Sequence, residues 1–452
     1  MIVNKFISIA ALIVTLGILV TIHEFGHFWV ARRCGVKVLR FSVGFGKPIY
    51  RYVGKTGTEF TLAMIPLGGY VRMLDEREGD VPDSMKGQAF NNKSVGQRIA
   101  IVAAGPIANF ILAVFIYALV ALLGVQSIAP KVGQIEKNSP MAQTEVQSGD
   151  EIVSIAGEQV ASWEDVNLVL ASLIGETRTI IVRYQVEGLS SQQENAVRLS
   201  GWPMDAQSNN LIKSFGVIPW QPKVVPIIDR VVDGGAAFVA GFQVGDEIIE
   251  ILGQPTEDWQ QVVVLVQANP NKDLPVKVKR NQDVKVLLLR PNSTEQNGRV
   301  LGYAGLAVVP PEWDDSLVRK RSYGFLESFS YGVAQTSKMV SLTVSSIGKM
   351  LQGLISVDNL SGPITIAKVA SASAESGLQS FLKFMAYLSV SLGVLNLLPI
   401  PMLDGGHLLF FGIEAIRRKP VSEKIQSMAY RVGASLLFAL MAIAIFNDIA
   451  RL

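Results

Sequence analysis

Four long apolar segments constrain the fold of this chain more than any other feature. The clearest is residues 99–130, which carry no formal charge, and a helix needs about 20 apolar residues to cross a bilayer. The others are residues 6–22, continuing to about residue 30, then 384–403 and the shorter 432–447. Charged residues make up only 17% of the chain, against about 25% in a typical soluble domain. We therefore expect an α-helical polytopic membrane protein with about four transmembrane helices.

The first apolar segment ends in His23-Glu24-Phe25-Gly26-His27. On a helix the two imidazoles share one face and can bind one Zn²⁺, while the glutamate beside them can take a proton from metal-bound water. A cleaved secretory signal is an alternative, but no Ala-x-Ala-like site follows the segment. A structural histidine pair is disfavoured because buried ionisable groups are costly in a membrane and usually functional. The motif predicts a zinc protease that acts inside a membrane.

A catalytic zinc takes three protein ligands and one water, so the two histidines need a partner. Asp404 and His407 follow the third apolar segment, where two prolines should break or kink the helix and could turn a carboxylate inward. We favour Asp404 as the third ligand and keep His407 as its rival. Cys34, the only cysteine, lies about 10 Å along a helix from His27 and is interpreted as structural.

The distribution of basic residues predicts the orientation in the membrane. Residues 31–98 are rich in Lys and Arg, and residues 417–424 between the third and fourth segments carry four more, so both loops should be cytoplasmic. Residues 131–380 then lie on the far side, with the histidine motif towards the cytoplasm. The net charge of +3 and the absence of a basic, aromatic-laced patch argue against a nucleic-acid partner. We expect membrane lipid to surround the transmembrane helices.

The region between the second and third segments contains an internal repeat. Ser148-Gly-Asp-Glu-Ile-Val-Ser-Ile-Ala-Gly157 recurs 96 residues later as Val244-Gly-Asp-Glu-Ile-Ile-Glu-Ile-Leu-Gly253, and a tryptophan follows each copy at the same offset. A repeat of this length is a domain rather than a solenoid unit. The pattern resembles tandem PDZ domains, whose groove accepts a peptide as an added strand. Structural β-modules with a blocked groove are the alternative, and the peptide ligand stays open.

The expected organisation follows in chain order. It comprises a first transmembrane helix with the zinc motif (1–30), a cytoplasmic-side loop with a re-entrant β-hairpin (31–98), a second transmembrane helix (99–126), two inserted α/β PDZ-like domains (127–221 and 222–312), an amphipathic membrane-associated helix (323–355), a third transmembrane helix with the Asp ligand (380–408) and a fourth (427–448). Residues 58–73 alternate and could offer an edge strand to a substrate, with an ordinary cytoplasmic hairpin as the alternative. Residues 105–109 are interpreted mainly as a packing and kink site.

Taken together, these motifs resemble the site-2 protease family of intramembrane zinc metalloproteases, of the bacterial type that regulates sigma-E and carries tandem PDZ domains. The resemblance rests on the histidine motif, on Asn396 through Gly406, on Phe45 between two glycines, and on residues 65–71. It implies zinc ligands His23, His27 and Asp404, with Glu24 as the catalytic acid/base. It also implies a membrane-re-entrant β-loop.

The substrate-binding residues expected from these motifs are Asn396, Pro399, Gly68, Gly69 and Tyr70. The family acts in regulated intramembrane proteolysis, so the expected substrates are single-span membrane proteins such as a trimmed anti-sigma factor, and signal-peptide remnants. The expected location is the bacterial inner (cytoplasmic) membrane, with periplasmic PDZ-like domains and the active site towards the cytoplasm. A membrane-tethered PDZ scaffold with a vestigial metal site is the alternative; it has no use for the glutamate of the motif.

Overall fold

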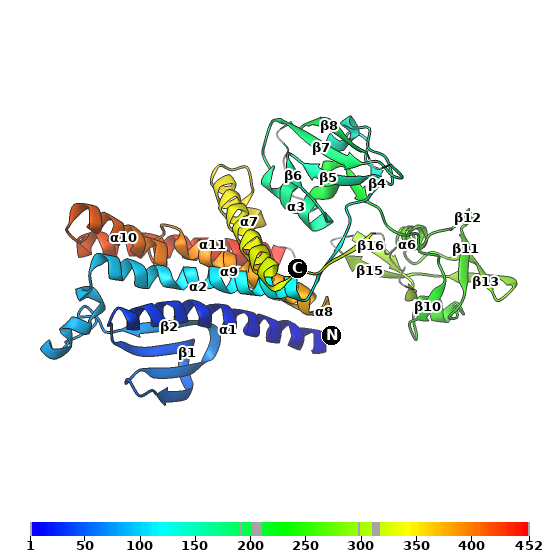
Figure 1. Cartoon of the computed structure of the whole chain (residues 1–452). Helices are drawn as coiled ribbons and strands as arrows, with labels where there is room; N and C mark the ends of the chain where they lie inside the picture. The colour runs from blue at the N-terminus through cyan, green and yellow to red at the C-terminus, as the bar shows by residue number, and fades with distance from the viewer. Residues whose placement is uncertain are drawn as a thin grey trace.

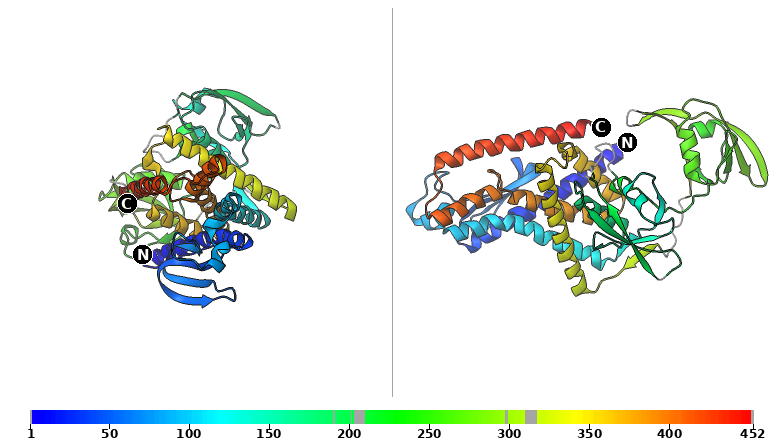
Figure 2. Two further views of the ribbon diagram at one scale, coloured as in Figure 1. Left: turned by 90° about the vertical axis from the view of Figure 1, so that its left-hand side faces the viewer. Right: turned by 90° about the horizontal axis from the view of Figure 1, so that it is seen from above.

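A bundle of long helices forms one part of the molecule, and two β-rich modules form the other (Figure 1). The computed structural model describes residues 2–189, 191–200, 202, 210–296, 299–309 and 317–450. Both chain termini lie at the end of the bundle that faces the β modules (Figures 1 and 2).

Four helices in the described part of the chain are long and apolar enough to cross a membrane. They are α1 (Ile2–Arg33), α2 (Val95–Leu122), α9 (Leu378–Leu397) and α11 (Glu423–Ala450). This number agrees with the four segments expected from the sequence. Helix α2 is central and packs against α1 and α9. Its start is fixed by a capping box, in which the side chain of Ser94 accepts the Gln97 N–H and the Gln97 side chain accepts the Ser94 N–H.

The third apolar segment differs from the expected helix over residues 380–408. Helix α9 ends at Leu397, and a separate helix α10 (Asp404–Arg417) begins after a tight turn, so Asp404 opens a new helix instead of closing a span. Pro399 lacks the N–H that would continue α9, and Met402 has a positive φ of 90°. The turn is close-packed, because a Cβ on Gly405 would lie 2.1 Å from the carbonyl oxygen of Leu398.

A curved two-stranded sheet lies beside α1. Strand β1 (Val38–Val53) pairs with β2 (Glu59–Met73), and both strands change register in their middle parts. Residues 38–43 pair with residues 69–73 and also with residues 59–62, and residues 48–53 pair with residues 59–63. Within the described pairings, residues 69–73 are therefore an edge that bonds on one side only. A β-hairpin is present within residues 31–98, but it is formed by β1 and β2, and residues 59–73 are a single long strand rather than a hairpin of their own.

Each sequence repeat forms its own β module with its own apolar core. The first β module consists of β4 (Val132–Ile135), β5 (Glu151–Ile155), β6 (Glu158–Gln159), α3 (Trp163–Ser172), β7 (Thr179–Gln185), β8 (Gln192–Arg198), α4 (Leu211–Phe215) and β9 (Val217–Pro219). The second consists of β10 (Ile228–Val231), α5 (Ala236–Val239), β11 (Glu247–Ile251), β12 (Gln254–Pro255), α6 (Trp259–Gln267), β13 (Leu274–Arg280), β14 (Asp283–Leu289), β15 (Asn292–Gln296), β16 (Arg299–Tyr303) and β17 (Leu306–Val308).

The two modules share one topology. The sheet order is β6-β5-β7-β8 in the first and β12-β11-β13-β14 in the second, and each module has a further two-stranded pair, β4-β9 or β10-β17. The registers also correspond, since Ile155 pairs with Val182 and Ile251 with Val276. The modules differ before their last strand, where the first has helix α4 and the second has the hairpin β15-β16. The internal repeat in the sequence is therefore a structural repeat.

Two antiparallel strands connect the β modules to the bundle. Strand β3 (Val125–Ile128) follows α2 and pairs with β18 (Val318–Arg321), which leads into helix α7 (Phe325–Leu351). Helix α7 crosses α2 closely, because a Cβ on Gly332 would lie 2.4 Å from the Val114 carbonyl oxygen. It occupies the range expected of the amphipathic helix and is not among the described helices that qualify as spans. Helix α8 (Pro363–Glu375) then packs on α1 and α9.

Candidate active site

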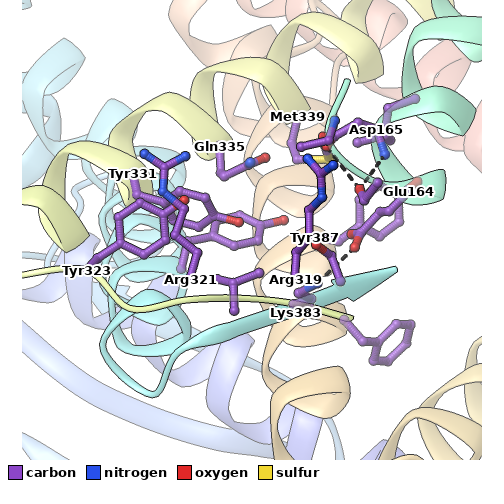
Figure 3. Close-up of a pocket in the computed structure, with 17 residues that line it drawn as sticks. Glu164, Asp165, Arg319, Arg321, Tyr323, Tyr331, Gln335, Met339, Lys383 and Tyr387 are labelled. Carbon is purple, nitrogen blue, oxygen red and sulfur yellow. Dashed lines mark hydrogen bonds and ion pairs between the residues drawn. The ribbon is translucent and has the colours of Figure 1, made fainter. Parts of the chain in front are cut away.

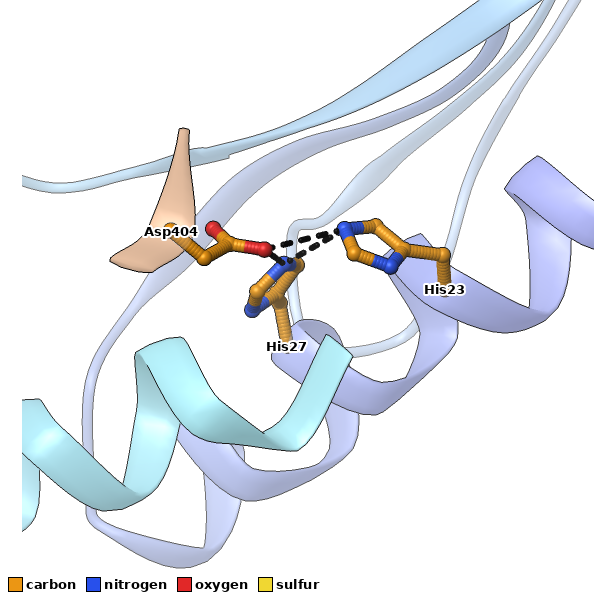
Figure 4. A group of neighbouring side chains, drawn as sticks. All are labelled: His23, His27 and Asp404. Carbon is orange, nitrogen blue, oxygen red and sulfur yellow. Dashed lines mark hydrogen bonds and ion pairs between the residues drawn. The ribbon is translucent and has the colours of Figure 1, made fainter. Parts of the chain in front are cut away.

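Three side chains from distant parts of the sequence meet inside the bundle. His23 and His27 lie one turn apart on α1, and Asp404 is the first residue of α10 (Figure 4). The Nε2 atoms of the two histidines are 3.2 Å apart, and Asp404 Oδ2 lies 3.2 Å from His23 Nε2 and 3.5 Å from His27 Nε2. Both histidines are buried.

The spacing of these atoms fits a zinc ion. Ligands bound at about 2.05 Å in a tetrahedron are separated by about 3.3 Å, close to the distances observed. Asp404 Oδ2 is shielded from solvent and makes no hydrogen bond of good geometry to the described residues. An acceptor buried opposite two imidazole nitrogens needs a cation or a proton to offset its desolvation. The donor set of two nitrogens and one carboxylate oxygen leaves a fourth tetrahedral position for water.

The other ring nitrogen of each histidine contacts helix α2. His27 Nδ1 lies 2.9 Å from the carbonyl oxygen of Ile101, so Nδ1 carries the proton and Nε2 keeps its lone pair for a metal. His23 Nδ1 lies 3.2 Å from the side-chain amide of Asn109, which is 0% exposed and whose Oδ1 has no described partner. Because amide oxygen and nitrogen are interchangeable by rotation, Oδ1 can accept the His23 proton instead. The sequence indicated Asn109 mainly as part of a packing and kink site, and in the structure it is a neighbour of the candidate ligands.

Glycines allow α1 and α2 to approach closely at the site. A Cβ on Gly105 would lie 2.3 Å from His27 Nε2, and a Cβ on Gly26 would lie 2.3 Å from the carbonyl oxygen of Ala104. Both distances are far inside van der Waals contact. Gly26 of the histidine motif therefore allows the two helices to pack closely, and Gly105 of α2 leaves room for the His27 imidazole.

Glu24 lies between the candidate metal ligands and the edge of the β sheet. The N–H of Val71 in β2 donates to its carboxylate. A Cβ on Gly69 would come within 3.3 Å of the Glu24 Cγ. The edge strand over residues 69–73 is therefore in direct contact with the motif glutamate.

A cavity of about 560 Å³ adjoins this cluster and is lined by His27, Tyr70, Asp404 and His407, among others. His407 lies one turn beyond Asp404 and is 3.4 Å from the Tyr430 hydroxyl through Nδ1. Within the described residues, the group of potential metal ligands contains His23, His27 and Asp404 without it. This geometry favours Asp404 over its rival.

The remaining expected site residues are less closely grouped. Tyr70 stacks on Phe45 at 6.3 Å and accepts a hydrogen bond from Arg40, while Gly68 lies beside the same Phe45 ring. Asn396 is in the last turn of α9, and Pro399 is in the turn that follows. No described hydrogen bond or ion pair joins these two residues to the histidines or to Asp404.

Comparison with known proteins agrees with the geometry. The profile of peptidase family M50 matches residues 11–440, which is nearly the whole chain. The chain belongs to peptidase family M50. It is 45% identical over 443 residues to a "putative zinc metalloprotease" of Vibrio cholerae, covering 98% of each chain. It is also 45% identical over 449 residues to the "regulator of sigma-E protease RseP" of Escherichia coli, covering 98% of this chain and 99% of that one.

A third relative, the "regulator of sigma E protease" of Haemophilus influenzae, is 41% identical over 447 residues. Family M50 is the site-2 protease family and is zinc-dependent. This M50 peptidase is accordingly a zinc metalloprotease, and the resemblance expected from the motifs is confirmed. The cluster in Figure 4 is the described group of side chains that can hold the metal.

Proposed function

We propose that this M50 peptidase hydrolyses peptide bonds inside the membrane, with His23, His27 and Asp404 as zinc ligands and Glu24 as the general acid/base. One observation carries the proposal. The three potential ligand atoms lie within 4.8 Å of one another, buried among helices that qualify as membrane spans. Ionisable groups at such depth are costly and mark functional sites.

The chemistry follows from the side chains around the cluster. A zinc ion held by His23, His27 and Asp404 would supply a water of lowered pKa and would polarise the scissile carbonyl. The Glu24 carboxylate would accept a proton and would deliver it to the leaving amine. Ile101 and Asn109 contact the Nδ1 atoms of His27 and His23. These contacts keep the Nε2 lone pairs of both histidines directed at one point.

A helical substrate must unwind before it can be cut, because its carbonyls are engaged in hydrogen bonds. The edge at residues 69–73 can pair with an unwound segment as an added strand. The extended segment would then run past Glu24, which contacts the same edge. Gly68, Gly69 and Tyr70 would line this path, and Asn396 of α9 with Pro399 of the following turn would hold the substrate.

The substrate class comes from the relatives. Proteins that match 98% of this chain at 41–45% identity are named regulators of sigma-E, which supports cleavage of a membrane-anchored anti-sigma factor in regulated intramembrane proteolysis. Signal-peptide remnants are single-span segments of the same kind. The two β modules act as PDZ-like domains on the periplasmic side of a bacterial inner membrane. There they exclude substrates that have not been trimmed, and the catalytic cluster lies towards the cytoplasm.

Cleavage of a purified single-span substrate tests the proposal. A type II substrate, with its extracytoplasmic part intact or trimmed, is incubated in detergent with wild type and with Glu24→Gln. Wild type should cut the trimmed form, and the variant should cut neither form while it retains stoichiometric zinc. A wild type that binds zinc but cuts neither form would overturn the protease in favour of a PDZ scaffold.

A further inference from the structure

A second cavity lies where the first β module meets the helical bundle (Figure 3). Its volume is about 660 Å³, and its walls come from α3, β3, β18, α7, α9 and the end of α2. Lys383 in its wall is thirteen residues before Asn396 on α9, which corresponds to about 20 Å along the helix. The cavity is therefore separate from the candidate active site and has no part in the chemistry described above.

Among the described residues, the charges around the cavity leave one cation without a carboxylate partner. Ion pairs join Lys383 to Glu164 (2.8 Å), Lys338 to Asp165 (3.3 Å) and Arg319 to Glu151. In the described part of the chain, no ion pair involves Arg321, whose guanidinium lies 4.8 Å from the centre of the Tyr323 ring. Arg319 and Arg321 alternate along β18 and share a face towards the cavity, whereas Lys320 points to the other face.

Two tyrosine hydroxyls line the same cavity as this cation. Tyr117 lines the cavity and is only 7% exposed, and its hydroxyl has no hydrogen-bond partner among the described residues. Tyr331 lies 5.0 Å from Tyr323 between ring centres. Burial raises the pKa of Tyr331 to about 12, so its hydroxyl remains protonated. One guanidinium and two hydroxyls therefore suit a singly charged anion rather than a cation.

The cavity continues onto a helix face that suits apolar chains. Phe384 and Tyr387 are in its wall on α9, which qualifies as a membrane span. Tyr387 is 48% exposed, and Leu395, eight residues further along the same face, is 46% exposed. Tyrosines are typical of the membrane–water interface, and four of them line this cavity. A ligand with an anionic head and apolar tails fits this continuous surface.

We propose that this cavity binds the phosphate diester of a phospholipid, with Arg321 as the cation and Tyr117 and Tyr331 as neutral donors, while the acyl chains lie along α9. A phosphate diester carries one negative charge, which matches the one cation in the cavity wall that has no carboxylate partner among the described residues. The proposal rests on the proposed membrane position of α2 and α9. The exposed face of α9 favours a lipid over a peptide carboxylate, because only the lipid has apolar chains that extend from its charged head.

Lipid titration of the delipidated full-length protein in detergent tests this site. Dioctanoyl phosphatidylglycerol is added and bound lipid is counted by native mass spectrometry. Dioctanoylglycerol has the same tails without the phosphate, and inorganic phosphate has the charge without tails. Wild type should bind one phospholipid saturably and bind both control compounds far more weakly. Arg321→Gln should weaken binding by about tenfold or more, because a hydrogen bond to a charged group is lost.

Matched variants separate the site from general damage. Lys320→Gln removes the same charge from the opposite face of β18 and should leave the affinity unchanged. Tyr117→Phe removes one hydroxyl and should weaken binding by about fivefold. Equal effects of Arg321→Gln and Lys320→Gln, or equal binding of dioctanoylglycerol, would refute the proposal. Displacement of phosphatidylglycerol by inorganic phosphate at equal concentration, or binding only of a peptide with a free carboxyl terminus, would also overturn it.

Discussion

Asn109 offers a direct test of how α2 supports the candidate metal site. Its side chain is fully buried, and its amide lies 3.2 Å from His23 Nδ1, the ring nitrogen that faces away from the metal. Removal of such a supporting hydrogen bond typically costs 10–100-fold in metal affinity. This corresponds to about 1.4–2.7 kcal/mol of zinc-binding free energy. Asn109→Leu keeps most of the side-chain volume, so the loss should come from the missing hydrogen bond rather than from a cavity.

Competition with a zinc chelator measures this change. Wild type and Asn109→Leu are titrated in detergent, and the zinc retained is determined by elemental analysis. Asn447→Leu is the matched control, because Asn447 is also a buried asparagine on a candidate span and donates to Val357 and Leu360, away from the metal ligands. The control should keep wild-type zinc affinity even if its stability falls. Equal zinc affinity of Asn109→Leu and wild type would show that the amide does not orient His23.

Three further predictions follow from other parts of the molecule. Gly105→Ala should abolish zinc retention and proteolysis, because its Cβ would lie 2.3 Å from His27 Nε2, whereas Gly96→Ala on the same helix meets nothing within 4 Å and should be neutral in the same assays. Gly69→Val should slow cleavage of a single-span substrate without loss of zinc, because its Cβ would meet the Ser42 carbonyl oxygen at 2.7 Å and distort the edge beside the site. Burial alone would raise the pKa of Asp246, but Arg280 and a backbone N–H hold that pKa below its usual value. The second β module should therefore lose stability as the pH falls below about 4, and Asp246→Asn should be less stable at neutral pH and show a smaller acid-dependent loss by calorimetry.

The parts of the fold that could be predicted from sequence are those with a local periodic signal. Uncharged runs predicted the four long helices, and the spacing of His23 and His27 placed both imidazoles on one face of a helix. The repeat of 96 residues predicted two similar modules because each copy keeps the same glycines and apolar positions. Asp404 could be proposed from its depth and charge, since few polar residues lie near the ends of the spans.

The parts that could not be predicted depend on contacts between distant segments. In the sequence Asn109 is simply a polar residue within an apolar run. Its contact with His23 depends on the way α2 crosses α1, which the sequence does not show. The prolines predicted a break or a kink after Leu397, but hydropathy cannot separate a kinked helix from two helices joined by an apolar turn. The curvature of β1 and β2 depends on register changes that alternation does not encode.

The two β modules also differ in the side chains of α3 and α6, where the first module meets the bundle. Glu164 and Asp165 of α3 pair with lysines on α9 and α7, but the equivalent positions in α6 are Gln260 and Gln261. Leu168 of α3 packs against the apolar core of the bundle. The equivalent residue in α6 is Val264, which is 55% exposed. Since both modules share one topology, these substitutions change the outer surface and leave the core intact. The first module is thus joined by ion pairs to the helices that border the cavity in Figure 3, and the second lacks the acidic residues for the same contact.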